Sequence, residues 1–578
     1  MKILLFGSAF NGLCQRVHRE LTVMGHSVSF ELALNQESMI EAARLFKPDV
    51  IICPFLKERV PDRIWQKHIC LIVHPGIEGD RGPSALDWAI SSNVKEWGVT
   101  LLQAAKEMDA GDIWGTGNFT MRTARKASVY RREVTQQAIQ LIKQAVTDIR
   151  QYKIRPRPLD YTNPRVKGKL MPLMKQQDRQ IDWWLDDTET VIGKINAADS
   201  FPGLLDEIFE EPAYLFGAKP ETKLTGTPGS IIARSSDAYC KATIDGAVWI
   251  RMAKRKYGTE KECIKLPANQ VLDSVVAGLD HKVFLPPSQS GSYNDIYWHE
   301  KRGVGYLYFD FYNGAMNTEQ CRRLRQAVRA LKKRPVKVIV LMGGEDFWGN
   351  GIQLNCIEAS GNPAEESWRN IQAMDDLVEE IILSPKHVTL AALRNNAGAG
   401  GAIMPLACDK VILRDGIVLN PHYKTMGLYG SEYWTYLLPG RVGESRARKI
   451  IDDCLPMLAI EAFSLGVGDE LLEESWDNYH EYIVEYAEKL ASPKAHRQLL
   501  EQKAKRRKAD EKSKPLEQYR KEELHFMRES FFDPKSVYHQ ARYRFVHKKV
   551  DPGCVLRVAT HRKQSEKQPP ALELAPCA

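Results

Sequence analysis

Short apolar segments alternate with amphipathic ones near the N-terminus, and this alternation constrains the fold more than any other feature. Apolar runs at 3–7, 28–32, 49–53 and 70–73 are interleaved with helical periodicities at 12–25 and 38–46. Strands that are apolar throughout are buried on both faces, so this order predicts a parallel, doubly wound sheet with helices on both sides. Sheets of this kind bind ligands beyond the carboxyl ends of their strands.

The length of 578 residues exceeds what one hydrophobic core supports, so several domains are expected. The alternating α/β domain is assigned to residues 1–160. Shorter strands and turns, such as the Gly226–Ser230 turn, predict a small β-rich domain at 161–280. After a Pro/Gly/Ser-rich linker at 281–293, a second α/β domain is expected over 294–490. A basic helical extension at 491–550 precedes a tail at 551–578, Pro/Ala-rich from Gln564 onward, that is expected to be disordered.

Composition and cysteine usage limit the classes of protein that fit. A net charge of +8 with 43% hydrophobic and 27% charged residues is ordinary for a globular protein. The eleven cysteines include no C-x-x-C pair, which argues against a disulfide framework and a structural metal site. Apolar runs are far shorter than the ~20 residues that span a bilayer, so we expect a cytoplasmic protein without membrane or nucleic-acid partners. The basic run Lys503–Lys508 is interpreted as a solvated helical face or a phosphate contact.

A histidine and an aspartate mark a candidate site in the first domain. His74 directly follows the apolar segment 70–73, which places it at the carboxyl edge of the predicted sheet. Asp109 lies in a later glycine-containing turn, from which it can approach the histidine. An imidazole can move protons or stabilise an oxyanion, and a carboxylate can set its tautomer and charge. This pair indicates acyl-transfer chemistry, although His–Asp pairs are more often structural.

The spacing of these residues resembles the N10-formyltetrahydrofolate-dependent formyltransferases. That family has a histidine at a strand end, a loop ending in Arg-Gly and a later Asp-x-Gly turn, which His74, Arg81-Gly82 and Asp109–Gly111 match. The segments 180–183, 195–203 and 226–231 resemble the post-catalytic domain of methionyl-tRNA formyltransferases, so the likeness covers about residues 1–280. It implies N10-formyltetrahydrofolate as formyl donor, with Ile72 and Gly82 among the residues that bind it.

Two departures from the formyltransferase pattern concern the acceptor of the formyl group. The asparagine expected two residues before the histidine is Ile72, and the loop before Arg81 is shorter and lacks the usual Ser-Leu-Leu-Pro character. One polar group that would stabilise the oxyanion is therefore missing, which disfavours an amine acceptor. A thiol, with a pKa near ~8.5, is partly ionised already and needs less help from a base.

Two glycine-rich turns in the second α/β domain indicate a site for a carbonyl oxygen. They lie in Met342–Leu354 and Leu390–Asp409, each after an apolar strand segment. Glycine allows close approach of the backbone, and each turn can direct one N–H at the same oxygen. Glycines needed only for packing are the alternative interpretation of either turn alone.

Together and in this order, the turns resemble the crotonase (enoyl-CoA hydratase/isomerase) family, over about residues 294–490. The resemblance implies a coenzyme A thioester whose carbonyl lies in an oxyanion hole formed by Gly349 (or Asn350) and Gly400. The two hydration glutamates of that family are replaced by Ile403 and His422. His422, Tyr423 and Glu432 remain as catalytic candidates, with Glu432 either a buried general base or a solvated first-turn carboxylate.

The fusion of both halves resembles a family of [NiFe]-hydrogenase maturation proteins. That resemblance implies formyl transfer from N10-formyltetrahydrofolate to coenzyme A, followed by decarbonylation of formyl-CoA to carbon monoxide and CoA. Gln15, Arg131 and Arg542 are predicted to contact CoA, and a hydrogenase large subunit or its maturation complex is the expected partner. A formyltransferase for an amine with a non-catalytic back half, and a CoA-binding scaffold, remain alternatives.

Overall fold

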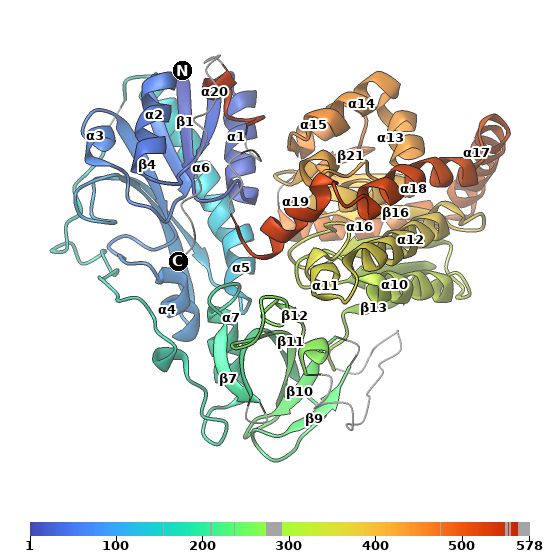
Figure 1. Ribbon diagram of the computed structural model, residues 1–578, viewed down its shortest axis with the longest axis horizontal. Helices are drawn as coiled ribbons and strands as arrows, with labels where there is room; N and C mark the ends of the chain where they lie inside the picture. Colours follow the sequence, from blue (N-terminus) through green and yellow to red (C-terminus); the bar gives the residue numbers. More distant parts are fainter. Residues whose placement is uncertain are drawn as a thin grey trace.

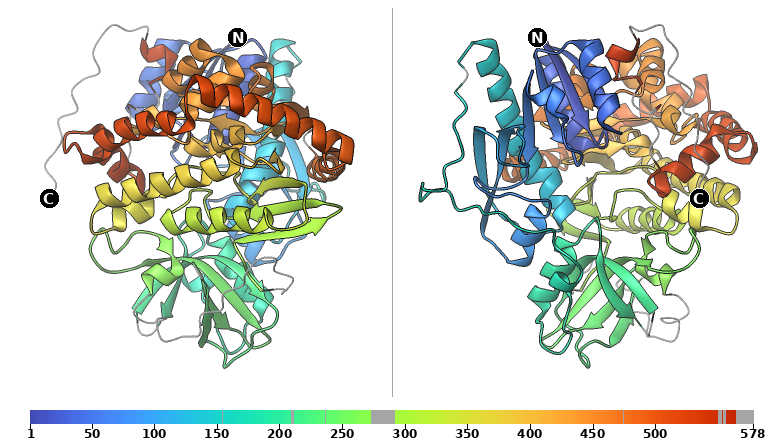
Figure 2. Two further views of the ribbon diagram at one scale, coloured as in Figure 1. Left: turned by 90° about the vertical axis from the view of Figure 1, so that its right-hand side faces the viewer. Right: turned by 60° about the vertical axis from the view of Figure 1, so that its left-hand side comes forward.

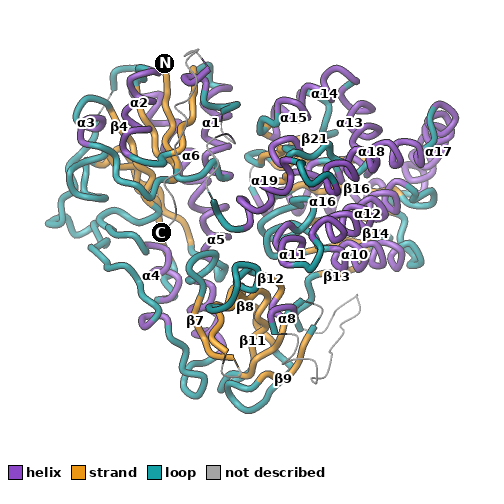
Figure 3. The backbone as a smooth tube through the Cα atoms, viewed as in Figure 1, coloured by secondary structure: helices purple, strands orange, loops and turns teal. Residues whose placement is uncertain are grey.

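The computed structural model of the protein describes residues 1–153, 155–208, 211–235, 237–272, 292–473, 475–549, 553 and 556–563. Figure 1 shows three units: a front unit in blue, a small unit in green, and a back unit from yellow to red. Figure 3 shows strands in the interior of the front unit with helices outside them, whereas strands dominate the small unit. Among the described residues, no helix is both long and apolar enough to cross a membrane.

The front unit is a six-stranded sheet between two layers of helices. Its strand order is β2 (Ser27–Leu32), β1 (Lys2–Gly7), β3 (Val50–Phe55), β4 (Ile69–His74), β5 (Glu96–Gln103) and β6 (Ile113–Thr120). Helices α1 (Gly12–Val23) and α6 (Thr135–Arg150) pack on one face, and α2 (Gln36–Phe46) and α3 (Asp62–Trp65) on the other.

The strand order confirms the predicted doubly wound α/β fold. Strands β1 to β4 run parallel, but β5 and β6 are antiparallel, which the sequence did not predict. The loop between β5 and β6 is too short for a crossover helix, so these two strands pair as a hairpin. Helix α4 (Ala85–Ser91) precedes β5, and α5 (Lys126–Val129) with the π-helical turn η1 (Tyr130–Val134) leads from β6 into α6.

The small unit is an antiparallel sheet, as the turn-rich sequence predicts. Its strands follow the order β7 (Leu204–Ile208), β8 (Glu211–Glu221), β11 (Ala247–Arg255), β10 (Tyr239–Ala242) and β9 (Ile231–Arg234), with β12 (Leu266–Pro267) beside β11. Helix α7 (Thr188–Ala197) covers the sheet, and α8 (Ala268–Val271) packs against β11. Most of the predicted linker at 281–293 lies outside the described residues.

The back unit contains a second, mostly parallel sheet. Its order is β13 (Ile296–Lys301), β14 (Val304–Phe309), β15 (Val338–Gly343), β16 (Val388–Leu393), β18 (Lys410–Arg414) and β21 (Glu470–Leu472). Helices α10 (Thr318–Leu331) and α12 (Pro363–Ile382) share the main core with one face, and α16 (Trp476–Leu490) covers the other. A small sheet of β17 (Ala397–Gly398), β19 (Val418–Asn420) and β20 (Met457–Leu458) carries the second glycine-rich turn.

The remaining helices enclose the back unit. They are α11 (Leu354–Ala359), α13 (Trp434–Val442), α14 (Glu444–Asp453), α15 (Ala459–Ser464), α17 (Pro493–Ser513), α18 (Leu516–Phe532) and α19 (Val537–Val546). Figure 2 shows the orange-to-red α17 and α18 lying across the unit, and Met527 and Phe531 of α18 belong to its core. Lys503 of the basic run is buried and its Nζ lies 2.7 Å from Asp409 Oδ2, so this lysine anchors α17.

Part of the segment predicted to be disordered is folded against the front unit. Val558 is buried there, and its carbonyl accepts a hydrogen bond from the Phe30 N–H of the edge strand β2. His561, in α20 (Thr560–Lys563), lies 2.8 Å from Glu31 Oε2, and Arg562 forms a two-pronged ion pair with the same carboxylate. The expectation for 551–578 is therefore wrong at 558–563, because Glu31 and the open edge of β2 provide long-range partners.

Candidate functional site

One cavity of about 1010 Å³ lies between the front and back units. Its walls include His74 and Asp109 of the front unit, and Asn395, Asn396 and Trp476 of the back unit. The Asn396 carbonyl accepts a hydrogen bond from the Trp348 N–H at 2.9 Å, so the cavity wall adjoins the first glycine-rich turn. The front candidate site therefore lies on the cavity wall, and the cavity adjoins the first glycine-rich turn; Gly349, Gly400 and Glu432 are not among its lining residues.

The fold brings His74 and Asp109 together, as the sequence predicts. His74 ends β4 and is 4% exposed, and its Nδ1 lies 3.6 Å from Asp109 Oδ1. Asp109 occupies a left-handed turn between β5 and β6, with φ 55°, and its other oxygen accepts the Gly82 N–H at 3.3 Å. This geometry holds an imidazole and a carboxylate side by side on the cavity wall.

A second aspartate contacts the histidine and was missed from the sequence. Asp80 Oδ2 lies 2.8 Å from His74 Nε2, and both side chains are buried. Asp80 was visible in the Gly-Asp-Arg-Gly sequence at the end of the loop. Because it directly precedes Arg81, it is more easily interpreted as the ion-pair partner of that arginine. Arg81 instead pairs with Glu107, at 3.1 Å.

The two predicted folate contacts also lie at this site. Ile72 and Gly82 line the cavity, one on β4 and the other in the loop after it. Gly82 has φ +115°, and a Cβ at this position would overlap the Met171 carbonyl. Glycine is therefore required for the loop to approach the segment 169–171 and to direct its N–H at Asp109.

The two glycine-rich turns of the back unit meet backbone to backbone. A Cβ on Gly401 would overlap the Gly349 carbonyl group, so glycine alone permits this contact. The Asn350 N–H donates to the Gly314 carbonyl at 2.7 Å. Because the Asn350 N–H already has this partner, the Gly349 N–H is the better of the two candidates for the oxyanion hole.

Glu432 lies directly at the predicted oxyanion hole. A Cβ on Gly400 would overlap the Glu432 carboxylate, and this side chain is 1% exposed. Its Oε2 accepts a hydrogen bond of 2.7 Å from the Tyr423 hydroxyl. Burial, together with the nearby charge of Asp375, raises the pKa of Glu432 to about 8. The Glu432 carboxyl is therefore buried and is not a solvated first-turn carboxylate, while its role as a base stays a prediction.

Two further buried carboxylates hold the turn that carries Glu432. Residues 432 and 433 are both left-handed, with φ 61° and 60°. Asp375 of α12 accepts the Glu432 N–H at 2.9 Å, and Glu523 of α18 accepts the Tyr433 N–H at 2.9 Å. Neither residue could be found from the sequence, because they are distant along the chain and belong to no local motif.

His422 faces the same region but is poorly placed to donate a proton. A Cβ on Gly398 would lie 3.2 Å from His422 Cε1, which puts the ring beside the second turn. Its Nδ1 lies 2.7 Å from the Asn420 carbonyl, so Nδ1 carries the proton and Nε2 is the free nitrogen. Burial lowers the pKa of His422, which keeps the ring neutral.

Of the three predicted CoA contacts, only Arg131 is among the residues that line the cavity. Arg131 of η1 lies 3.2 Å from Asp346 Oδ2 and over the Phe347 ring. Gln15 of α1 donates to the Phe10 carbonyl at 3.0 Å. Arg542 of α19 is buried, with its Nε 2.6 Å from Glu358 Oε2. The cavity wall carries further cations that the sequence did not single out, among them Arg16, Arg132 and Arg414, interspersed with carboxylates.

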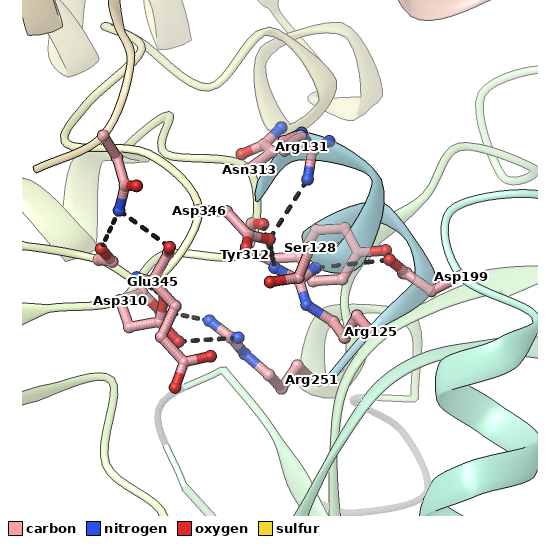
Figure 4. A network of polar contacts seen from close by, with 12 residues as sticks. Arg125, Ser128, Arg131, Asp199, Arg251, Asp310, Tyr312, Asn313, Glu345 and Asp346 are labelled. Atoms are coloured by element: carbon pink, nitrogen blue, oxygen red, sulfur yellow. Dashed lines mark hydrogen bonds and ion pairs between the residues drawn. The ribbon is translucent and has the colours of Figure 1, made fainter. Parts of the chain in front are cut away.

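A buried polar network joins the three units beside the cavity (Figure 4). Arg125, which directly precedes α5, donates to Asp346 Oδ2 at 2.5 Å and to the Tyr312 carbonyl at 3.0 Å. The Tyr312 hydroxyl in turn donates to Asp199, after α7. Asp346 immediately precedes the loop of Gly349, so the network ties the front unit to the first glycine-rich turn.

Replacing Arg125 by alanine is expected to destabilise the assembly of the units. Asp346 and Asp199 would remain buried next to a missing cation, a loss of about 3–5 kcal/mol in the free energy of unfolding. Chemical denaturation followed by tryptophan fluorescence measures the change. Arg322→Ala, whose side chain is 57% exposed, is the matched control and should leave the transition in place. Equal curves for both variants would contradict this role.

Comparison with known proteins places the chain in a family. It is 44% identical over 564 residues to the hydrogenase maturation factor HoxX of Bradyrhizobium diazoefficiens, covering 97% of both chains. The chain belongs to the HypX/HoxX family of hydrogenase maturation factors. A crystal structure of HypX from Aquifex aeolicus in complex with tetrahydrofolic acid is similar with a TM-score of 0.92 and 42% identity, over 97% of this chain and 99% of that one.

The two halves of this HypX/HoxX family member match separate family models. Residues 173–262 match the formyl transferase C-terminal domain, and residues 300–551 match enoyl-CoA hydratase/isomerase. Methionyl-tRNA formyltransferase of Thermotoga neapolitana is 25% identical over 202 residues, which cover 34% of this chain and 63% of that protein. The predicted formyltransferase-like and crotonase-like domains are thus confirmed.

Proposed function

We propose that this protein makes carbon monoxide for [NiFe]-hydrogenase maturation by two successive reactions, formyl transfer at the cavity wall of the front unit and decarbonylation at the glycine-rich turns of the back unit. The observation that carries the proposal is the environment of Glu432, a buried carboxylate at the paired glycine-rich turns. His74 and Asp109 on the cavity wall supply the site for the preceding formyl transfer. Coenzyme A and N10-formyltetrahydrofolate are substrates in this scheme.

The first reaction transfers formyl from N10 of the folate to the CoA thiol. The C–S bond forms as the C–N10 bond breaks, the thiol proton is lost and N10 gains a proton. His74 can take the first proton and return one to the leaving nitrogen, while Asp109 stabilises the imidazolium. Ile72 replaces the asparagine of formyltransferases at the cavity wall, which fits a thiol that needs little activation.

The second reaction breaks formyl-CoA into carbon monoxide and CoA. Glu432 accepts the formyl hydrogen as a proton, the C–S bond breaks, and the thiolate is protonated, so that atoms and charge balance. Taking the formyl hydrogen protonates Glu432. Glu432 can then return this proton to sulfur, so His422 need not act as a donor. N–H groups of Gly349 and Gly400 would stabilise charge on the carbonyl oxygen.

Exclusion of water supports decarbonylation over hydrolysis. Ile403, at the position of a hydration glutamate, is 1% exposed, and Tyr423 occupies one oxygen of Glu432. A carboxylate that is almost fully buried and already engaged by a phenol has little room to orient a water. This is the feature that distinguishes the proposed function from fatty-acyl-CoA hydration.

The anionic parts of both substrates fit the basic residues of the cavity. Arg131, Arg132 and Arg414 line it, and the guanidinium groups of the last two lie 4.0 and 4.8 Å from the Trp476 ring centre. A guanidinium provides paired donors for phosphate oxygens, and the indole offers a stacking surface for an aromatic ring. Tetrahydrofolate bound to HypX of A. aeolicus supports folate as a ligand here.

Decarbonylation is expected to depend on pH through Glu432. Its pKa is raised to about 8, so the basic form grows as pH rises, and the rate should fall about tenfold per pH unit well below the midpoint. Initial rates of CO release from supplied formyl-CoA between pH 6 and 9 measure this. The sign for stability is opposite: a folded pKa above the unfolded one favours folding at low pH, and this contribution is lost as pH rises through about 8. A flat rate profile would contradict the assignment.

Incubation with N10-formyltetrahydrofolate and CoA tests the proposed function as a whole. CO is followed by its binding to a ferrous haem protein, and formylated products are followed by mass spectrometry. The proposal expects CO; a formylated amine without CO would support the amine formyltransferase, and tight CoA binding without turnover would support the scaffold. Either of these results overturns the proposal.

A further inference from the structure

His74 has a different carboxylate on each ring nitrogen. Nε2 lies 2.8 Å from Asp80 Oδ2, which is a hydrogen-bond distance, whereas Nδ1 lies 3.6 Å from Asp109 Oδ1, which is too long for one. A neutral imidazole carries one proton, and the short contact to a carboxylate retains it on Nε2. Nδ1 is then left with its lone pair on the side of Asp109.

The two aspartates differ in their relation to the cavity. Asp109 lines it together with His74, but Asp80 does not belong to its wall. Asp80 is 5% exposed, and it contacts the imidazole nitrogen opposite to the one beside Asp109. It therefore contacts the histidine from outside the cavity wall.

The loop that carries Asp80 is shaped for this contact. A Cβ on Gly76 would overlap both Asp80 Oδ2 and the His74 ring, so glycine at this position makes room for the pair. The Asp80 N–H donates to the Ile77 carbonyl at 2.9 Å, and the Gly168 N–H donates to the Glu78 carbonyl at 3.0 Å. The segment around Gly168 thus fixes the loop from outside.

We infer that Asp80 is the positioning residue of His74, and that Asp109 is the carboxylate that faces the reactants. The sequence assigned the setting of the tautomer to Asp109; the geometry transfers that role to Asp80. This inference rests on the proposed formyl transfer and adds the direction in which its proton moves.

The consequence is a defined path for the proton in the first reaction. The thiol proton moves to Nδ1 as sulfur attacks the formyl carbon, which makes an imidazolium flanked by Asp80 and Asp109. The same Nδ1 proton then passes to N10 as the C–N10 bond breaks, so His74 returns to its neutral form. Asp80 keeps the Nε2 proton throughout and stabilises the imidazolium without taking part in bond changes.

Asp80→Asn in the full-length protein tests this role. The amide oxygen can still accept from Nε2–H, but the charge is lost and the amide can also present its N–H to Nε2, which favours the wrong tautomer. We expect kcat for formyl-CoA formation to fall by about 10²–10⁴, with KM for CoA and for the folate donor little changed. Asp112→Asn, at an exposed aspartate directly before β6, is the control and should keep full activity.

Nitrogen-15 NMR of the histidine rings measures the tautomer of His74, which would not change if Asp80 only supported the fold. In the native protein His74 should be the Nε2–H tautomer, and in Asp80→Asn it should become mixed or inverted. Gly76→Ala, which pushes on the pair from the other side, should shift the same signals and lower kcat, even if the asparagine variant does not fold. A native Nδ1–H tautomer, or an Asp80→Asn variant with kcat within about threefold of the native value, would overturn the inference.

The tautomer measurement also separates two kinds of failure. If the native protein transfers no formyl group to CoA, the proposed function fails, yet the ring assignment still decides whether Asp80 positions His74. If transfer occurs but the tautomer is Nδ1–H, the inference alone fails.

Discussion

Glu432→Gln is expected to abolish CO release while leaving formyl transfer intact, so that formyl-CoA accumulates. Glutamine retains the size of the side chain and can still accept from the Tyr423 hydroxyl, but it cannot take the formyl proton. The loss should be at the upper end of the range for a general base, about 10³–10⁴ in rate. Quenched time courses analysed by mass spectrometry measure both formyl-CoA and CO.

Glu444→Gln is the matched control for this variant. Its side chain is 74% exposed in the first turn of α14, so the same chemical change should leave both reactions at native rates. Removing the Glu432 carboxyl should also flatten the dependence of thermal stability on pH between about 4.5 and 8, where the folded state holds a proton that the unfolded state has released. Continued CO release by Glu432→Gln would place the base elsewhere.

His74→Ala is expected to produce the opposite pattern, with no formyl-CoA formed from the folate donor. The variant loses the proton carrier and leaves Asp80 and Asp109 facing a space without the imidazole between them, so a rate loss of about 10³-fold or more is predicted. Supplied formyl-CoA should still be converted to CO at the native rate, because the back site does not use this residue. Full transfer activity without His74 would disprove the assignment of the front site.

The complementary behaviour of these two variants is more informative than either alone. A protein with a single active site would lose both reactions in each variant. Mixing His74→Ala with Glu432→Gln should restore CO production only as far as formyl-CoA escapes from one molecule and enters another. The extent of restoration therefore measures how well one molecule retains formyl-CoA between its two sites.

Some site residues follow from sequence because their partners lie in short motifs. His74 ends a buried strand, and Asp109 belongs to an Asp-x-Gly turn, so their meeting at the sheet edge could be predicted. Gly349 and Gly400 carry equally local signals in glycine-rich turns. Glu432 could be named, but its burial could not, because that depends on the packing of α12 and α18 over the turn.

Other features depended on contacts between distant segments and could not be predicted. Asp80 is recognisable only once Gly76 is seen to admit it beside His74. The contact of His561 with Glu31 joins residues separated by 530 positions, which is why the segment before the Pro/Ala-rich stretch was also expected to be disordered. Arg542 forms a buried ion pair with Glu358, a partner that its local sequence does not indicate, and its contact with CoA stays a prediction.

The dependence of CO release on catalytic amounts of CoA tests the central claim most directly. The protein is supplied with N10-formyltetrahydrofolate labelled with carbon-13 in the formyl group and with less CoA than donor. CoA is consumed by formyl transfer in the front unit and regenerated by decarbonylation in the back unit. The account therefore predicts labelled CO in several-fold excess over CoA, and none when CoA is left out. Labelled CO formed without CoA, or no CO despite intact donor, would contradict it.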